Sequence, residues 1–152
     1  MASVTIRPAR ISEREALTEL ERRSSMHQPM YRERLAAHPD AIELPAAQIV
    51  AGFVQVAEQD GIVAGFAVLL ERTVDACELD GLFVEPERMR GGVGRRLVED
   101  ARRIARERGA TRIDVIVNPQ AVAFYEAVGF RPAGEAQTRF GPASRMSLTV
   151  AG

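Results

Sequence analysis

The sequence predicts an α+β fold: a mixed, mostly antiparallel sheet of about seven strands with helices on both faces. Two observations carry this prediction. First, two apolar, β-branched segments, residues 49–58 and 62–72, flank an Asp60-Gly61 pair, which is a strong hairpin signal. Second, a long amphipathic helix begins at the glycine cluster of residues 91–94, and a further strand and helix follow it. The expected order of elements is β-α-α-β-β-β-α-β-α-β-β.

Composition favours a single globular domain over residues 1–152. With 46% hydrophobic and 27% charged residues, the chain is too apolar for a disordered protein and too charged for a membrane-embedded one. All basic residues are arginine, and the net charge of -1 gives no field that would attract nucleic acid or anionic lipid. Cys77 is the lone cysteine, and no cluster of His and Cys suggests zinc. We therefore expect a cytoplasmic protein that uses no metal and binds neither nucleic acid nor membrane.

The N-terminal elements are a short strand and a helix. Residues 4–6 are expected to form the strand. Ser12 and Glu15 form a capping-box pattern, so the helix should run from there to about Arg23. Residues 24–48 contain three prolines and give weak signals, with one short helix expected at residues 31–37.

The second half of the chain is expected to alternate between strands and helices. The helix at the glycine cluster should end at Gly109, since glycine is the usual residue after a helix. Asn118 should cap the last helix, with Pro119 at its first position and Gly129 at its end. The apolar stripe of the first of these helices is Val93, Leu97, Val98, Ala101, Ile104 and Ala105. The expected strands cover residues 75–84, 113–117, 130–133 and 145–150, with a Gly/Pro loop between the last two.

The glycine cluster predicts an anion site. A turn between a strand and a helix start directs unpaired N–H groups outward, and the helix dipole adds partial positive charge, so phosphate or pyrophosphate can bind there. A dinucleotide fingerprint would need glycine at Leu97, and a P-loop would need a Gly-Lys pair, so both are excluded. The alternative is that these glycines only permit a tight turn.

Two motifs resemble those of the GNAT superfamily of acetyl-CoA-dependent N-acetyltransferases. The first is the loop Met89-Arg90-Gly91-Gly92-Val93-Gly94, in which Met89 replaces the usual Gln or Arg. The second is Asn118-x-x-Ala121-x-x-x-Tyr125-Glu126-x-x-Gly129-Phe130, which matches the family's late strand-helix-strand signature. One helix and one strand separate the two motifs, as the resemblance requires.

The resemblance implies a GNAT-like fold and transfer of an acetyl group from acetyl-CoA to a primary amine, without metal. Tyr125 would be the general acid that protonates the coenzyme A sulfur. Glu78 would be the base, with Asp80 and Glu85 as alternatives. Residues expected to contact the coenzyme are Phe83 and Val84 through their backbone, the loop residues Met89, Arg90, Gly91, Gly92, Val93 and Gly94, the following Arg95, and Asn118.

The acceptor is expected to be a small-molecule amine. Its identity is not readable, because residues 24–48 mix charges of both signs. His27 and His38 lie in that segment and have the chemistry for proton transfer near neutral pH, although the sequence favours surface histidines over a catalytic role. A non-catalytic acyl-CoA-binding or sensor module is the alternative function. The sequence leaves open whether the protein forms a homodimer.

Overall fold

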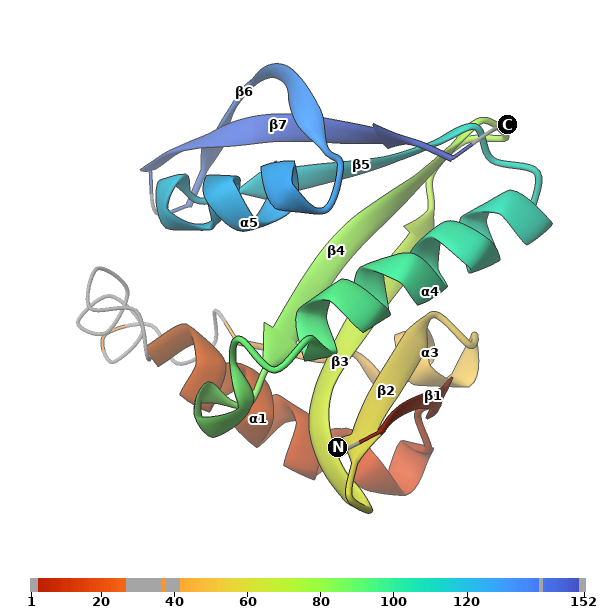
Figure 1. Cartoon of the computed structure of the whole chain (residues 1–152), viewed down its shortest axis with the longest axis vertical. Coiled ribbons are helices and arrows are strands. Elements are labelled where there is room, and N and C mark those ends of the chain that lie inside the picture. Colours follow the sequence, from red (N-terminus) through yellow and green to blue (C-terminus); the bar gives the residue numbers. More distant parts are fainter. Residues whose placement is uncertain (1–2, 27–36, 38–41, 140, 151–152) are drawn as a thin grey trace. The chain divides into compact units, whose positions relative to one another are not determined.

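The computed structural model describes residues 3–26, 37, 42–139 and 141–150. In this part of the chain, seven strands are hydrogen-bonded in the order β1-β2-β3-β4-β5-β7-β6 (Figure 1). The pairs β1–β2, β2–β3, β5–β7 and β6–β7 are antiparallel and the pair β4–β5 is parallel, which confirms the predicted mixed α+β sheet. The chain divides into two compact units: residues 1–68 with 81–97, and residues 69–80 with 98–152. The strands β3 and β4 and the helix α4 contribute residues to both units.

In the first unit, β1 (Val4–Pro8), β2 (Val54–Gln59) and β3 (Ile62–Glu71) are neighbours in the sheet. The β2–β3 turn confirms the hairpin predicted from Asp60-Gly61. Asp60 and Gly61 have φ of 56° and 75°, so both central residues are left-handed, as the tight hairpin turn requires.

The start of the first helix differs from the prediction. A 3-10 turn over Ile11–Glu13 leads into α1 (Arg14–Met26), and the capping carboxylate is Glu13 rather than Glu15. Glu13 accepts from the Arg10 N–H at 2.8 Å and from the Arg7 guanidinium at 2.7 and 2.9 Å. The hydrogen bonds from Arg7 lower the pKa of Glu13 to about 2. Arg7 of β1 therefore determines which carboxylate caps the helix, and the predicted capping box of Ser12 and Glu15 was wrong.

The segment before β2 is a helix, not the start of a strand. Residues Ala46–Val50 form α3, which follows Pro45 and buries Ile49. Gly52, with φ of 80°, ends it, and its N–H donates to the Ile49 carbonyl at 3.0 Å. A short apolar segment does not reveal its period, which is why the strand prediction for residues 49–53 was wrong. Of the predicted helix at 31–37, residues 31–36 lie outside the described residues, as do His27 and His38.

In the second unit, β4 (Ala76–Val84) and β5 (Arg112–Val117) form the parallel pair, joined through residues 76–78 and 112–114. Antiparallel β7 (Gly141–Thr149) pairs with β5 and with the edge strand β6 (Arg131–Thr138). The Gly/Pro loop predicted between residues 133 and 145 was wrong, because most of it is strand. Gly134, with φ of 121°, lies at a register shift, and an edge strand accommodates Pro132.

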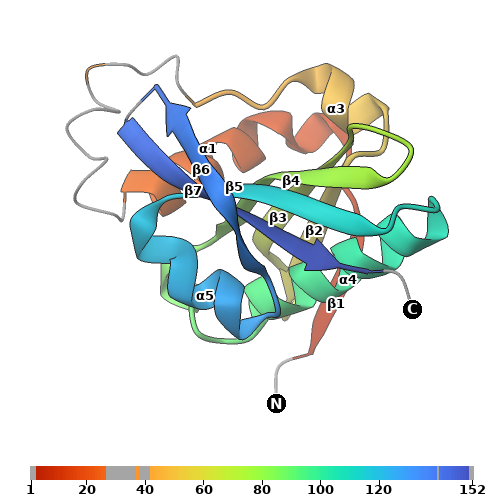
Figure 2. The ribbon, with the colours of Figure 1, turned by 90° about the horizontal axis from the view of Figure 1, so that it is seen from above.

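Two helices follow the prediction closely. Helix α4 (Val93–Glu107) buries its predicted stripe, except that Ile104 is half-buried, and Gly109 with φ of 85° follows its end. Asn118 caps the 3-10 turn Pro119–Ala121 that leads into α5 (Val122–Ala127). In the first unit, α1 and α3 lie on one face of β2 and β3 and the start of α4 lies on the other (Figure 2). None of the described helices is long and apolar enough to cross a membrane.

A close backbone approach at Gly65 joins three segments of the first unit. A Cβ atom at Gly65 would lie 2.6 Å from the Phe83 carbonyl oxygen of β4 and 3.2 Å from the side chain of Val93, the first residue of α4. Next to it, the Glu85 N–H donates to the Ala64 carbonyl at 2.8 Å. The residues at both ends of the glycine-containing loop therefore lie against one point of β3.

We expect Gly65→Ala to lower the free energy of unfolding by about 1 to 3 kcal/mol, because the added methyl group meets backbone atoms that have no room to move. Urea unfolding followed by circular dichroism measures the change.

Gly81→Ala is the matched control. Its Cβ atom would approach only ring atoms of Phe83, at 2.6 Å for the closest, and a side chain can rotate away. Equal stability losses in the two variants would show that the backbone contact at Gly65 is not tight.

Candidate functional site

The loop between β4 and α4 is shaped by two left-handed residues. Arg90 and Gly92 have φ of 69° and 84°, a conformation that glycine adopts without strain and arginine does not. The Arg96 N–H donates to the Gly92 carbonyl at 3.0 Å. This hydrogen bond closes the first turn of α4. Helix geometry leaves the N–H groups of the preceding residues, from Val93 to Arg95, without an acceptor inside the helix. These donors and the helix dipole suit an anion.

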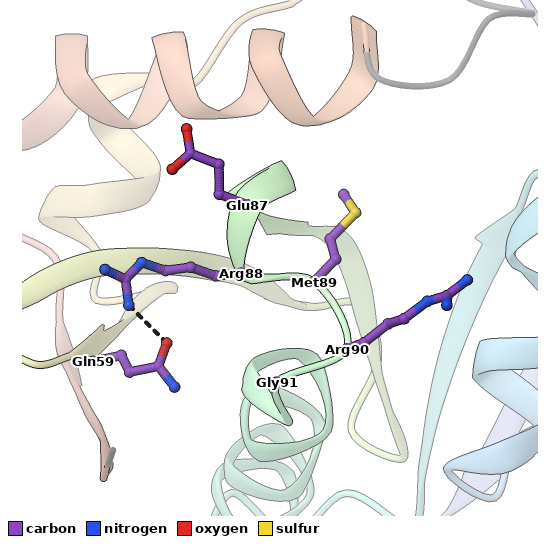
Figure 3. Close-up of a pocket in the computed structure, with 6 residues that line it drawn as sticks. All are labelled: Gln59, Glu87, Arg88, Met89, Arg90 and Gly91. Atoms are coloured by element: carbon purple, nitrogen blue, oxygen red, sulfur yellow. Dashed lines mark hydrogen bonds between the residues drawn. The ribbon is translucent and has the colours of Figure 1, made fainter. Parts of the chain in front are cut away.

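A cavity of about 360 Å³ lies beside this loop. It brings together three of the predicted residues, Met89, Arg90 and Gly91, and adds residues that the sequence analysis missed. The cavity is lined by Gln59, Glu87, Arg88, Met89, Arg90 and Gly91. In Figure 3, the side chains of Met89 and Arg90 point away from Arg88 and Gln59.

Arg88 fastens the loop to the β2–β3 hairpin. Its Nη1 donates to Gln59 Oε1 at 2.8 Å, which is drawn as the dashed line in Figure 3. Gln59 is the last residue of β2, 29 positions earlier in the chain, so no local sequence signal connects the two residues.

The strand end before the loop is held by α1. Arg23 of α1 donates to both carboxylate oxygens of Glu85, at 2.9 and 2.7 Å. The bond to Glu85 raises the pKa of Arg23. Glu85, an alternative base in the sequence analysis, therefore has an arginine partner, as Glu78 has in Arg72. Phe83 and Val84 precede it at the end of β4, and the Phe83 ring packs 5.2 Å from that of Phe66.

Tyr125 lies in the second unit on α5 and is only 8% exposed. Its ring meets those of Phe124 and Phe130 edge-on, with centroids 5.2 and 5.3 Å away. Burial raises the pKa of Tyr125 well above the ordinary 10, because the phenolate loses hydration. The hydroxyl therefore holds its proton through neutral pH, as a proton donor must.

Asn118 and Glu78 also belong to the second unit, and both have partners. The Asn118 side-chain oxygen accepts from the N–H groups of Gln120 and Ala121 at 3.0 and 3.2 Å, which accounts for the residue as a cap. Glu78 is ion-paired with Arg72. Near it, the pKa of Asp80 is raised, first by partial loss of hydration and then by the charge of Glu78.

The predicted residues thus fall into two groups, each within one unit. Phe83, Val84 and the segment from Met89 to Arg95 belong to the first unit, and Glu78, Asn118 and Tyr125 belong to the second. Among the residues that the structure describes, no three of His, Cys, Asp and Glu gather as metal ligands.

Comparison with known proteins agrees with the motifs. The model of the acetyltransferase (GNAT) family matches residues 14–130. No curated protein matches the chain. Among solved structures, PaiA N-acetyltransferase from Thermoplasma acidophilum, in complex with coenzyme A, aligns with a TM-score of 0.78 at 23% identity, covering 97% of this chain and 99% of that one.

Two further solved structures have the same fold. The ribosomal-protein-S18-alanine N-acetyltransferase from Escherichia coli has a TM-score of 0.72 at 23% identity, covering 99% of this chain and 96% of that one. An aminoglycoside 6'-N-acetyltransferase complexed with coenzyme A has a TM-score of 0.73 at 16% identity, covering 97% and 98%. Because the family model spans most of the sequence and the fold agrees, the chain belongs to the GNAT family of acetyltransferases.

Proposed function

We propose that this protein transfers the acetyl group of acetyl-CoA to the primary amine of a small molecule. Family membership makes the chain an acetyltransferase that acts with coenzyme A, so the proposal concerns the acceptor and the role of each residue. The observation that supports it most is the start of α4, where a left-handed Gly92 leaves the donors of the first helical turn open to an anion.

The reaction joins the amine nitrogen to the thioester carbonyl carbon and breaks the bond between that carbon and sulfur. The amine loses a proton and the departing thiolate gains one, so the site needs a base and an acid. It also needs donors for the oxygen that becomes negative during the attack. Acetyl-CoA is the co-substrate and supplies the activated acetyl group.

The N–H groups of Val93, Gly94 and Arg95 would hold the pyrophosphate of the coenzyme. Arg90 and Arg95 add positive charge, and this compensates for Met89, which has no charge to offer. The backbone N–H groups of Phe83 and Val84 would serve the acetyl carbonyl and the pantetheine arm. Asn118 would contact the pantetheine through its amide NH₂, because its oxygen is occupied by the cap.

Tyr125 would protonate the thiolate. Its raised pKa supports this role, since the proton is present at any pH at which the enzyme would act. Glu78 would accept the proton of the amine, directly or through water. Asp80 is the rival, because it lies two residues along the same strand and its raised pKa makes it a stronger base than an ordinary aspartate.

We expect coenzyme A to stabilise the protein by about 2.7 kcal/mol at about 100 times its dissociation constant, because it binds only the native state. Gly92→Val should abolish this gain, since a side chain there blocks the approach to the helix start and disfavours φ of 84°. The melting temperature with and without coenzyme A measures both effects.

Gly52→Val is the matched control, because Gly52 has a similar φ of 80° and lies at the end of α3. It should carry the same backbone strain and keep the coenzyme response. If millimolar coenzyme A does not shift the melting temperature of the wild type, the proposed activity is wrong.

Tyr125→Phe should lower turnover at saturating acetyl-CoA by about 10² to 10⁴-fold, because it removes a general acid and leaves the ring packing in place. Coenzyme affinity should not change. Because burial raises the pKa of Tyr125 above its ordinary value of 10, the rate of the wild type should not fall through loss of this proton at or below pH 10. Release of coenzyme A thiol over a range of pH measures the rate.

Glu78→Gln and Asp80→Asn separate the two candidate bases. Each keeps the side-chain shape and removes the proton acceptor, so the variant that abolishes the acidic limb of the pH profile identifies the base.

Wild-type turnover in Tyr125→Phe would contradict the role of Tyr125 as the acid and would mean that solvent protonates the thiolate. A protein that binds coenzyme A but transfers no acetyl group would be a non-catalytic module.

A further inference from the structure

A second cavity, of about 460 Å³, lies entirely within the second unit. Its lining includes the carboxylate of Glu78 and combines polar and apolar residues, most of them from β5 and β7. The charged and hydroxyl residues that line it are Arg72, Glu78, Arg112, Asp114, Arg145 and Ser147.

Strand alternation places the polar lining residues of β5 and β7 on one face. On β5, Ile113 and Val115 are buried, with 0% and 3% of their surface exposed. The alternate residues Arg112, Asp114 and Ile116 therefore point to the other face. The β5–β7 register sets Asp114 opposite Ser147 and Ile116 opposite Arg145. The result is a sheet face that is charged where the opposite face is apolar.

The two carboxylates in this cavity already have partners. Glu78 pairs with Arg72. Asp114 accepts from Arg112 Nε, 3.2 Å from each of its oxygens, and from the Ser147 hydroxyl at 2.9 Å. Their negative charges are therefore matched by two of the three arginines.

Arg145 is the third arginine. Its Nε donates to the backbone carbonyl of Glu135 at 3.3 Å, and this partner carries no charge. The lining contains three guanidinium groups and two carboxylates, so the side chains that line the cavity carry one net positive charge. Ile116, opposite Arg145 and 42% exposed, adds an apolar surface beside it.

We propose that this cavity binds a carboxylate of the acceptor, with Arg145 as its main contact, so that the acceptor is a small amine that is also an acid, as an amino acid is. The inference rests on the proposed function and narrows its substrate class. Guanidinium binds a carboxylate through two parallel hydrogen bonds, which fixes the ligand in orientation as well as in position.

The charge balance also argues against a polycationic acceptor. A polyamine or an aminoglycoside would bring several positive charges to a lining that already has a surplus of one, and both carboxylates are engaged. An amino acid brings one carboxylate for Arg145 and an aliphatic part for Ile116. A cavity of this size has ample room for such a molecule.

The test compares amines that differ only in their acid group. L-alanine and L-leucine are each paired with their carboxamides, and spermidine represents polycations. In the wild type with coenzyme A, the Nε–Hε signal of Arg145 in an NMR titration should shift saturably with the two acids and not with the amides or spermidine. Hydrogen bonds to charged groups are worth about 1.5–3 kcal/mol, so kcat/KM should favour acids over amides by about 10- to 100-fold.

Arg145→Gln should reduce this ratio towards one and leave the melting shift with coenzyme A unchanged. Arg103→Gln is the control, since Arg103 pairs with Asp100 and Glu107 on α4 outside the cavity, and it should keep the ratio.

Equal signal shifts with acids and amides, no saturable shift with either acid, or an unchanged ratio in Arg145→Gln would overturn the inference. A protein that acetylates spermidine in preference to the amino acids would overturn it too. Failure of coenzyme A to raise the melting temperature is a different outcome that contradicts the proposed function, and the titration still decides whether the cavity binds a carboxylate.

Discussion

The loop between β4 and α4, which we propose as the coenzyme site, depends on one backbone contact, the approach of β3 to β4 at Gly65. A single methyl group at this position would meet the Phe83 carbonyl of β4 and the Val93 side chain of α4. The last two residues of β4, Phe83 and Val84, and the residue that begins α4 thus all lie against the same glycine. Both ends of the loop that leads to the N–H donors of α4 are therefore in contact with β3.

Two polar contacts then secure the loop from its sides. Arg23 of α1 holds Glu85 at the start of the loop, and Gln59 of the hairpin holds Arg88 in the middle. These contacts use arginine and glutamine side chains, and they leave the Met89 and Arg90 side chains pointing elsewhere (Figure 3). Holding the loop before any ligand binds means that less conformational entropy is lost on binding. In the proposed coenzyme site, this would offset the absence of a polar side chain at Met89.

In the second unit, one face of the strands is apolar and buried, and the other face is charged. The buried face of β5 and β7 is apolar, and Tyr125 on α5 is packed between aromatic rings, which keeps its proton in place. The other face carries the ion pairs of Glu78 and Asp114 and the surplus charge of Arg145. In the proposed reaction, Tyr125 of α5 would supply the proton, and the polar face of β5 and β7 would bind the carboxylate of the acceptor.

The sequence by itself determined the features that depend on near neighbours in the chain. The Asp60-Gly61 turn, the Asn118 cap, the stripe of α4 and its end at Gly109 were all predicted, because each follows from the conformational preferences of a few consecutive residues. The family motifs are local in the same sense. The tertiary structure decided the cap at Glu13, which Arg7 of β1 selects, and the extension of β6 and β7, which pairing with β5 supports. It also decided the partners of Arg88, Glu85 and Glu78 and the surplus charge at Arg145, because these depend on which strands and helices become neighbours in the fold, and no local pattern contains that information.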